Sequence, residues 1–101
     1  MSAPPLLTPA ERAASLAALS AWRESPDDTS ITRSFKFKDF DAAFAFMTRV
    51  AEAARAADHH PDWSNSWNRV DIGLTTHASG GITERDVGLA RAIDAIFAAA
   101  G

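Results

Sequence analysis

The chain has 101 residues, no cysteine and a formal net charge of −3 at pH 7. This length fits one compact domain. The lack of cysteine excludes disulfides, thiolate metal sites and cysteine nucleophiles, and it suits the reducing cytoplasm where we expect the protein. The negative charge argues against a nucleic-acid partner, which needs a basic face. Charged residues interrupt the apolar stretches well before the ~20 residues that a membrane span requires, so no membrane role is expected.

A flexible lead-in is expected over residues 1–7, which contain two prolines, and a single domain over residues 8–101. A helix should begin directly after the lead-in. Thr8 can cap it, a proline occupies the first helical position, and Glu11 completes a capping box. The alanine-rich stretch that follows predicts a short helix ending near Ser20.

Two strands are predicted next, over residues 22–25 and 31–37. In the second, apolar Ile31 and Phe35 alternate with polar residues, which is the periodicity of a strand. Arg33 falls on the apolar side and breaks this pattern. Because turn residues separate the two segments, they predict a hairpin.

A long helix should follow, capped by Asp39. Apolar residues in it step by four and three, which predicts a buried stripe formed by Phe40, Phe44, Met47, Ala51 and Ala54. Pro61 cannot continue a helix and disfavours helix at the residue before it. The helix should therefore end near Ala57 or Asp58, and leave two histidines just beyond its end.

A second strand pair is predicted after the polar stretch around Asn65. Val70, Ile72 and Leu74 should share one face of the last strand. By the same alternation, His77 should lie on the opposite face. A glycine turn then leads into a last helix, with Asp86 suited to its electropositive first turn. The buried face of that helix should comprise Val87, Ala90, Ile93, Ile96, Phe97 and Ala100.

The predicted order is helix, two strands, helix, two strands, helix. Such an order with short links favours an α+β domain of two layers, with the helices on one face of an antiparallel sheet. The other face of so small a sheet must be solvated, bound to a ligand or covered by another subunit.

The three histidines fall in one part of the chain: His59 and His60 beyond a helix end, and His77 at a strand end. None interrupts an apolar stripe, so none is expected to be a buried packing residue. From these residues alone three interpretations remain open. They could be unrelated surface histidines, a metal site of no standard spacing, or acid–base groups, because imidazole can donate or accept a proton near neutrality.

A longer ordered set of residues resembles the signature of the pterin-4a-carbinolamine dehydratases. The strings are Asp58-His59-His60-Pro61-Asp62-Trp63 and Trp67-Asn68, then Thr76-His77, Gly80-Gly81-Ile82-Thr83 and Asp86, preceded by Phe35-Lys36-Phe37-Lys38-Asp39-Phe40. The resemblance runs from about Leu19 to Phe97. It implies a four-stranded antiparallel sheet with three helices on one face.

The resemblance also implies an activity. Members of this family are hydro-lyases that convert 4a-hydroxytetrahydropterin into quinonoid dihydropterin, without a metal or organic cofactor, and so recycle the pterin of aromatic amino acid hydroxylases. By similarity, His59 and His77 are the catalytic proton-transfer pair and His60 positions the pterin. Further substrate-binding positions implied by the resemblance are Asp58, Thr75, Thr76 and the backbone at Ala78.

Two positions depart from the family's pattern, because Arg55 and Ala78 stand where acidic residues are common. Lower activity or a shifted pH optimum is therefore expected. The resemblance also leaves two other functions open: a dimerisation cofactor for a transcription factor, or a pterin-binding role in molybdenum cofactor metabolism. The small sheet and its helical edges predict a homo-oligomer, either a dimer or a tetramer.

Overall fold

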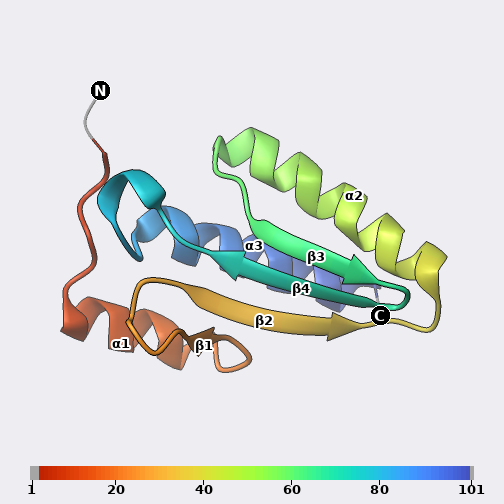
Figure 1. Ribbon diagram of the computed structural model, residues 1–101, viewed down its shortest axis with the longest axis horizontal. Helices are drawn as coiled ribbons and strands as arrows, with labels where there is room; N and C mark the ends of the chain where they lie inside the picture. Colours follow the sequence, from red (N-terminus) through yellow and green to blue (C-terminus); the bar gives the residue numbers. More distant parts are fainter. Residues whose placement is uncertain (1–2, 101) are drawn as a thin grey trace.

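The computed structural model describes residues 3–100 (Figure 1). Its elements follow the predicted order: α1 (Pro9–Ala17), β1 (Arg23–Glu24), β2 (Ile31–Lys36), α2 (Phe40–Ala57), β3 (Asp62–Ser66), β4 (Arg69–Leu74), the short 3-10 turn η1 (His77–Ser79) and α3 (Glu84–Ala100). The helix–strand–strand order predicted from periodicity is confirmed. None of the helices within residues 3–100 is long and apolar enough to cross a bilayer.

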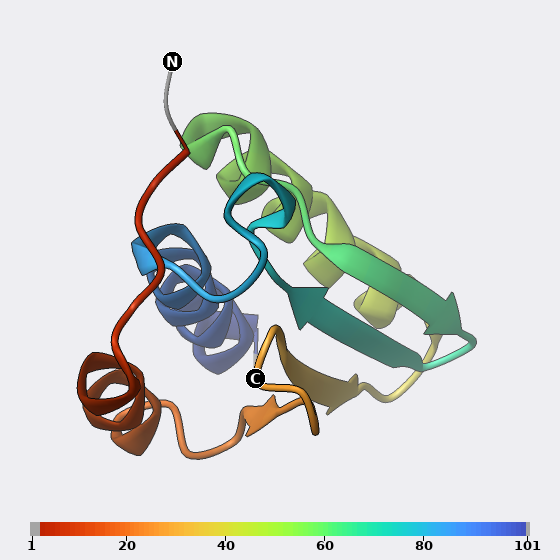
Figure 2. The same cartoon turned by 60° about the vertical axis from the view of Figure 1, so that its left-hand side comes forward.

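The four strands form one antiparallel sheet in the order β1-β2-β4-β3. Figure 2 shows α2 and α3 against one face of this sheet, with α1 on the same side near β1. The apolar side chains on one face of the sheet and the side chains of the helices that face them form the core. The largest fully buried side chains include Ile31, Phe35, Phe46, Ile72, Leu74 and Ile93.

The capping box predicted for α1 is present, since Thr8 Oγ1 accepts from the Glu11 backbone N–H and Glu11 Oε1 accepts from that of Thr8. The helix nevertheless ends at Ala17 and not near Ser20. It ends early because the chain turns inward there and buries Leu19 in the core. No helix or strand lies in residues 3–7, although the last of these, Leu7, is buried and bonded through its N–H to Ile82 O.

Arg33, which broke the strand pattern of β2, lies on the core side of the sheet. Its guanidinium covers the rings of Phe35 and Phe97, and one nitrogen lies 2.7 Å from Asp94 Oδ1. The charge is therefore paired with Asp94 while the side chain packs against aromatic surface.

The stripe predicted for α2 is wrong at Phe40 and Phe44 and correct at Ala54, which is buried. The helix packs on the sheet with a neighbouring face, formed by Ala43, Phe46, Val50 and Ala54. Phe40 and Phe44 remain 44% and 54% exposed, with their rings stacked on each other. Because α2 carries two apolar faces, periodicity could not decide which of them meets the sheet.

The second strand pair begins earlier than predicted. The polar stretch around Asn65 is itself the strand β3, paired with β4 through Trp63 opposite Ile72. The alternation of apolar and polar residues did not reveal β3, because it is an edge strand. Its residues are only half-buried on one side, and its serines are exposed on the other.

Candidate active site

The end of α2, the end of β4 and the beginning of α3 meet around a hollow of about 230 Å³. The residues that line it are Asp58, His59, His60, Thr75, Thr76, His77, Ala78 and Arg85. The structure thus brings together all seven residues that the sequence nominated for the site. Arg85 also lines the hollow and was not nominated from the sequence.

Asp58 ends α2 in the left-handed conformation, with φ 50° and ψ 43°. Its backbone N–H donates to Ala54 O, and so does the N–H of His59 at 3.1 Å. Aspartate tolerates this conformation better than most residues. The resulting corner terminates the helix at Ala57, as predicted, and directs the next side chain inward.

His59 is buried, with only 7% of its surface exposed. The expectation that no histidine would be buried is therefore wrong for this residue. Its Nε2 lies 2.6 Å from Oδ1 of Asp86, whose side chain is completely buried. A buried imidazole is tolerated here because a carboxylate satisfies its polar atom.

Asp86 is fixed by donors on its other oxygen. Oδ2 accepts from the Thr83 backbone N–H and from the Thr76 hydroxyl, each at 2.9 Å. Because an ionised carboxylate only accepts hydrogen bonds, we assign a proton to Nε2 of His59. Of the two ring nitrogens, Nδ1 is then the one left to exchange a proton with a ligand.

The sequence placed Asp86 in the first turn of the last helix and among the residues of the family resemblance, but did not nominate it for the site. Its neighbours carried a further signal, because Val87, Leu89 and Ala90 lie on the buried face of that helix. A carboxylate beside such a face must find buried donors. The partner could not be identified from the sequence, since His59 stands 27 residues away.

The other two histidines are exposed. His77 opens η1, beyond the end of β4, and its side chain is 80% exposed. Its Nε2 lies 3.3 Å from Oδ2 of Asp62, at the beginning of β3. His60 lies at the rim of the hollow. The site therefore combines one buried and two accessible imidazoles.

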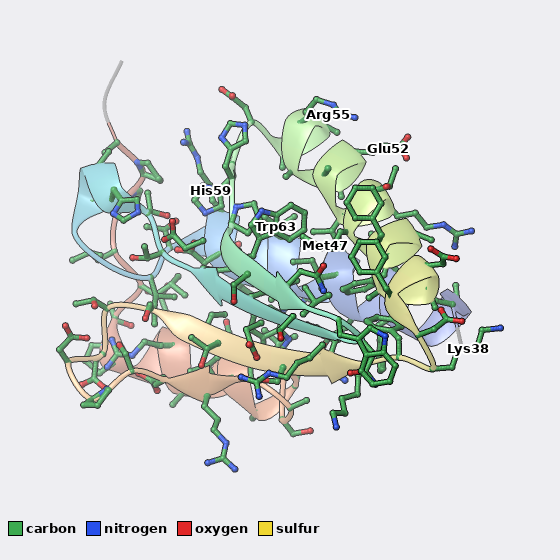
Figure 3. All side chains as sticks on the ribbon, turned by 45° about the vertical axis from the view of Figure 1, so that its right-hand side comes forward. Lys38, Met47, Glu52, Arg55, His59 and Trp63 are labelled. Atoms are coloured by element: carbon green, nitrogen blue, oxygen red, sulfur yellow. The ribbon has the colours of Figure 1, made fainter. Side chains whose placement is uncertain are left out.

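Arg55, one of the two departures from the family pattern, lines a neighbouring hollow of about 220 Å³ with Phe44, Met47 and Trp63. Figure 3 shows Met47 and Trp63 between α2 and β3, and Arg55 near the end of α2. Within residues 3–100, no group of three or more acidic or histidine side chains is arranged to hold a metal ion.

The fold and this hollow define a class of small two-layer α+β proteins with a histidine-lined site where a helix end meets a strand end. The family model described as pterin 4 alpha carbinolamine dehydratase matches residues 5–96. The chain belongs to this family.

Individual relatives agree with this assignment. A protein of Rhizorhabdus wittichii, named "Putative pterin-4-alpha-carbinolamine dehydratase", is 59% identical over 90 residues, which are 89% of this chain and 93% of that protein. The crystal structure of a "transcriptional coactivator/pterin dehydratase" from Brucella melitensis superposes with a TM-score of 0.87 at 48% identity, covering 91% of this chain and 98% of the other.

A more distant structure shares the fold alone. It is a pterin dehydratase-like protein described as a RuBisCO assembly factor in the alpha-carboxysome, with a TM-score of 0.66 at 22% identity, covering 75% of this chain and 88% of the other.

Proposed function

We propose that this protein dehydrates 4a-hydroxytetrahydropterin to quinonoid dihydropterin at the histidine-lined hollow, without a metal or organic cofactor. The observation that carries the proposal is the convergence of His59, His60 and His77 on one hollow, in a chain that belongs to the dehydratase family. The substrate would be supplied by an aromatic amino acid hydroxylase, whose reaction leaves the 4a-hydroxyl on the pterin ring.

The reaction breaks the bond between carbon 4a and its hydroxyl oxygen. One imidazolium protonates the leaving oxygen, which departs as water, and a second imidazole accepts the proton that the ring gives up as the new double bond forms. Two positioned histidines suit this exchange because each can hold or release a proton near neutrality. We assign the pair to His59 and His77, and a positioning role to His60.

The surroundings of the pair support these roles. Asp86 holds the ring of His59 in one orientation, while His77 reaches the same hollow from η1. Asp58 places a carboxylate on the lining, beside Thr75 and Thr76, and this carboxylate suits the polar edge of a pterin. Thr75 is constrained by the bond from its hydroxyl to Thr29 O.

The proposal is tested by following the loss of the carbinolamine in a rapid-mixing assay with purified protein. Wild type should accelerate dehydration well above the spontaneous rate, before and after treatment with a chelator. If the rate with protein equals the rate without it, the proposed activity is wrong. If activity disappears on chelation and returns with metal, the cofactor-free mechanism is wrong.

We also propose that the protein forms a homo-oligomer through the outer face of α2. Phe40 and Phe44 are largely exposed, and the half-buried Met47 and Trp63 adjoin Phe44 in the hollow beside β3. Exposed apolar surface of this kind marks interaction sites more often than it serves a monomer. Light scattering at micromolar concentration should give more than a monomer mass, and Phe44→Glu should reduce it.

The same face could serve a different protein partner, as the coactivator description of the Brucella melitensis structure suggests. A stable wild-type oligomer that Phe44→Glu dissociates favours self-association. A monomeric wild type at the same concentration contradicts the proposed homo-oligomer.

A further inference from the structure

Each of the two histidines proposed for proton transfer has an aspartate beside it. For His59 this partner is the buried Asp86. For His77 the partner is Asp62, whose Oδ2 lies 3.3 Å from Nε2 of His77. This is the ion pair that includes His77 among residues 3–100. The two pairs differ in setting, because the side chains of His77 and Asp62 are 80% and 70% exposed.

The fold places Asp62 beside His77 through strand pairing. Asp62 begins β3 directly after the Pro61 corner and pairs with Gly73 of β4. Gly73 has no side chain, and a Cβ there would approach Asp62 O to 3.4 Å. The chain of β4 then continues into η1, which begins with His77. The pair therefore connects the beginning of β3, which does not line the hollow, to η1, which does.

The charges around His77 make Asp62 its nearest carboxylate partner. The residue after His77 is the uncharged Ala78. Asp58 and Arg85 are the charged groups on the lining of the hollow besides the histidines, and Asp62 contacts His77 from outside that lining. A carboxylate next to Nε2 favours the ring form with a proton on that nitrogen and leaves Nδ1 for exchange with a ligand. It also restricts rotation of a ring that is otherwise exposed.

We propose that Asp62 is a positioning residue for His77, which holds the ring in one orientation and one tautomer for proton transfer. The inference rests on the proposed dehydratase function. Asp62 does not touch the reacting atoms in this proposal and acts only through His77. An exposed pair contributes modestly, and the contribution grows when a bound ring displaces water from the site.

The experiment compares the kinetics of Asp62→Asn with those of wild type and of a matched control. Asp62→Asn keeps the shape and removes the charge, and its kcat should fall about two- to fivefold, with KM nearly unchanged. Asp62→Glu should retain most of the wild-type kcat. The control is Asp41→Asn, which removes the same charge from an exposed position in the first turn of α2, and its kcat should equal that of wild type.

A second measurement separates positioning from a structural role. The ¹⁵N resonances of the His77 ring report which nitrogen carries the proton, and they should shift in Asp62→Asn but not in Asp41→Asn. The inference is wrong if kcat of Asp62→Asn equals that of the control, or if kcat falls while the His77 ring signals stay unchanged.

Failure of the inference is distinguishable from failure of the function. If His77→Ala turns over as fast as wild type, the proposed role of His77 fails. If His77→Ala is slow while Asp62→Asn behaves as wild type, the function stands and only the role of Asp62 is overturned.

Discussion

Replacing Asp86 by asparagine tests whether the buried carboxylate fixes the tautomer of His59. In the structure Asp86 Oδ2 receives two donors, and Oδ1 faces Nε2 of His59 at 2.6 Å. The amide oxygen of asparagine can serve the two donors from Thr76 and Thr83, which leaves its NH₂ group facing His59. Since two donors cannot bond, His59 must move its proton to Nδ1 so that Nε2 can accept.

Two separate effects follow from this substitution. The loss of a charge-assisted hydrogen bond at a buried site should lower the free energy of unfolding by about 1–3 kcal/mol. The nitrogen left for the ligand changes from an acceptor to a donor, which removes one acid–base group. The rate per folded molecule should therefore fall by about 10²-fold or more. The loss of stability alone would not slow the molecules that remain folded.

The assay measures both quantities on the same preparations, by urea denaturation and by the rate of carbinolamine loss at saturating pterin. Asp94→Asn is the matched control, because Asp94 also lies on α3 and accepts hydrogen bonds from Trp22 and Arg33, outside the site. It should lose stability but keep the turnover of the folded protein. If folded Asp86→Asn reacts within twofold of wild type, the proposed tautomer control is refuted.

Three further predictions concern packing, the helix end and pH. Phe46→Ala should lower the free energy of unfolding by about 3–5 kcal/mol, whereas Phe44→Ala, at a side chain that is 54% exposed, should change monomer stability little; equal losses in urea would contradict the observed face of α2. Asp58→Gly should not lower the melting temperature, because glycine adopts φ 50° without strain, but turnover should fall several-fold; full activity would exclude a role for this carboxylate. A hydrogen bond from Ser34, followed by a neighbouring guanidinium, holds the pKa of Asp71 below its ordinary value. The stabilisation of the fold by ionised Asp71 is therefore present above about pH 4 and lost as the pH falls through the lowered pKa. Asp71→Asn should melt at a lower temperature than wild type at pH 7 and at the same temperature at low pH. The same difference in melting temperature at both pH values would contradict this.

The order of the elements could be predicted because each signal is local. The capping box at Thr8, the alternation in β2 and the proline after α2 all depend on residues within a few positions of each other. The face that α2 buries could not be predicted, because the helix carries two apolar faces and the choice between Phe44 and Phe46 depends on the shape of the sheet.

The site was predictable as a set of residues but not as a geometry. The histidines stand close in the sequence or at element ends, and the resemblance joined them to Asp58 and the threonines. The burial of His59 depends on Asp86, which only folding brings near. Likewise, the approach of Asp62 to His77 follows from the pairing of β3 with β4, and the polar sequence of β3 concealed that strand.

In the proposed reaction, His59 and His77 transfer the protons of the dehydration. The most direct measurement is the pre-steady-state rate of carbinolamine loss with wild type, His59→Ala and His77→Ala at equal concentrations of folded protein. Wild type should react fast, and each variant should lose about 10²-fold or more of its rate. Near wild-type rates in both variants would contradict these roles.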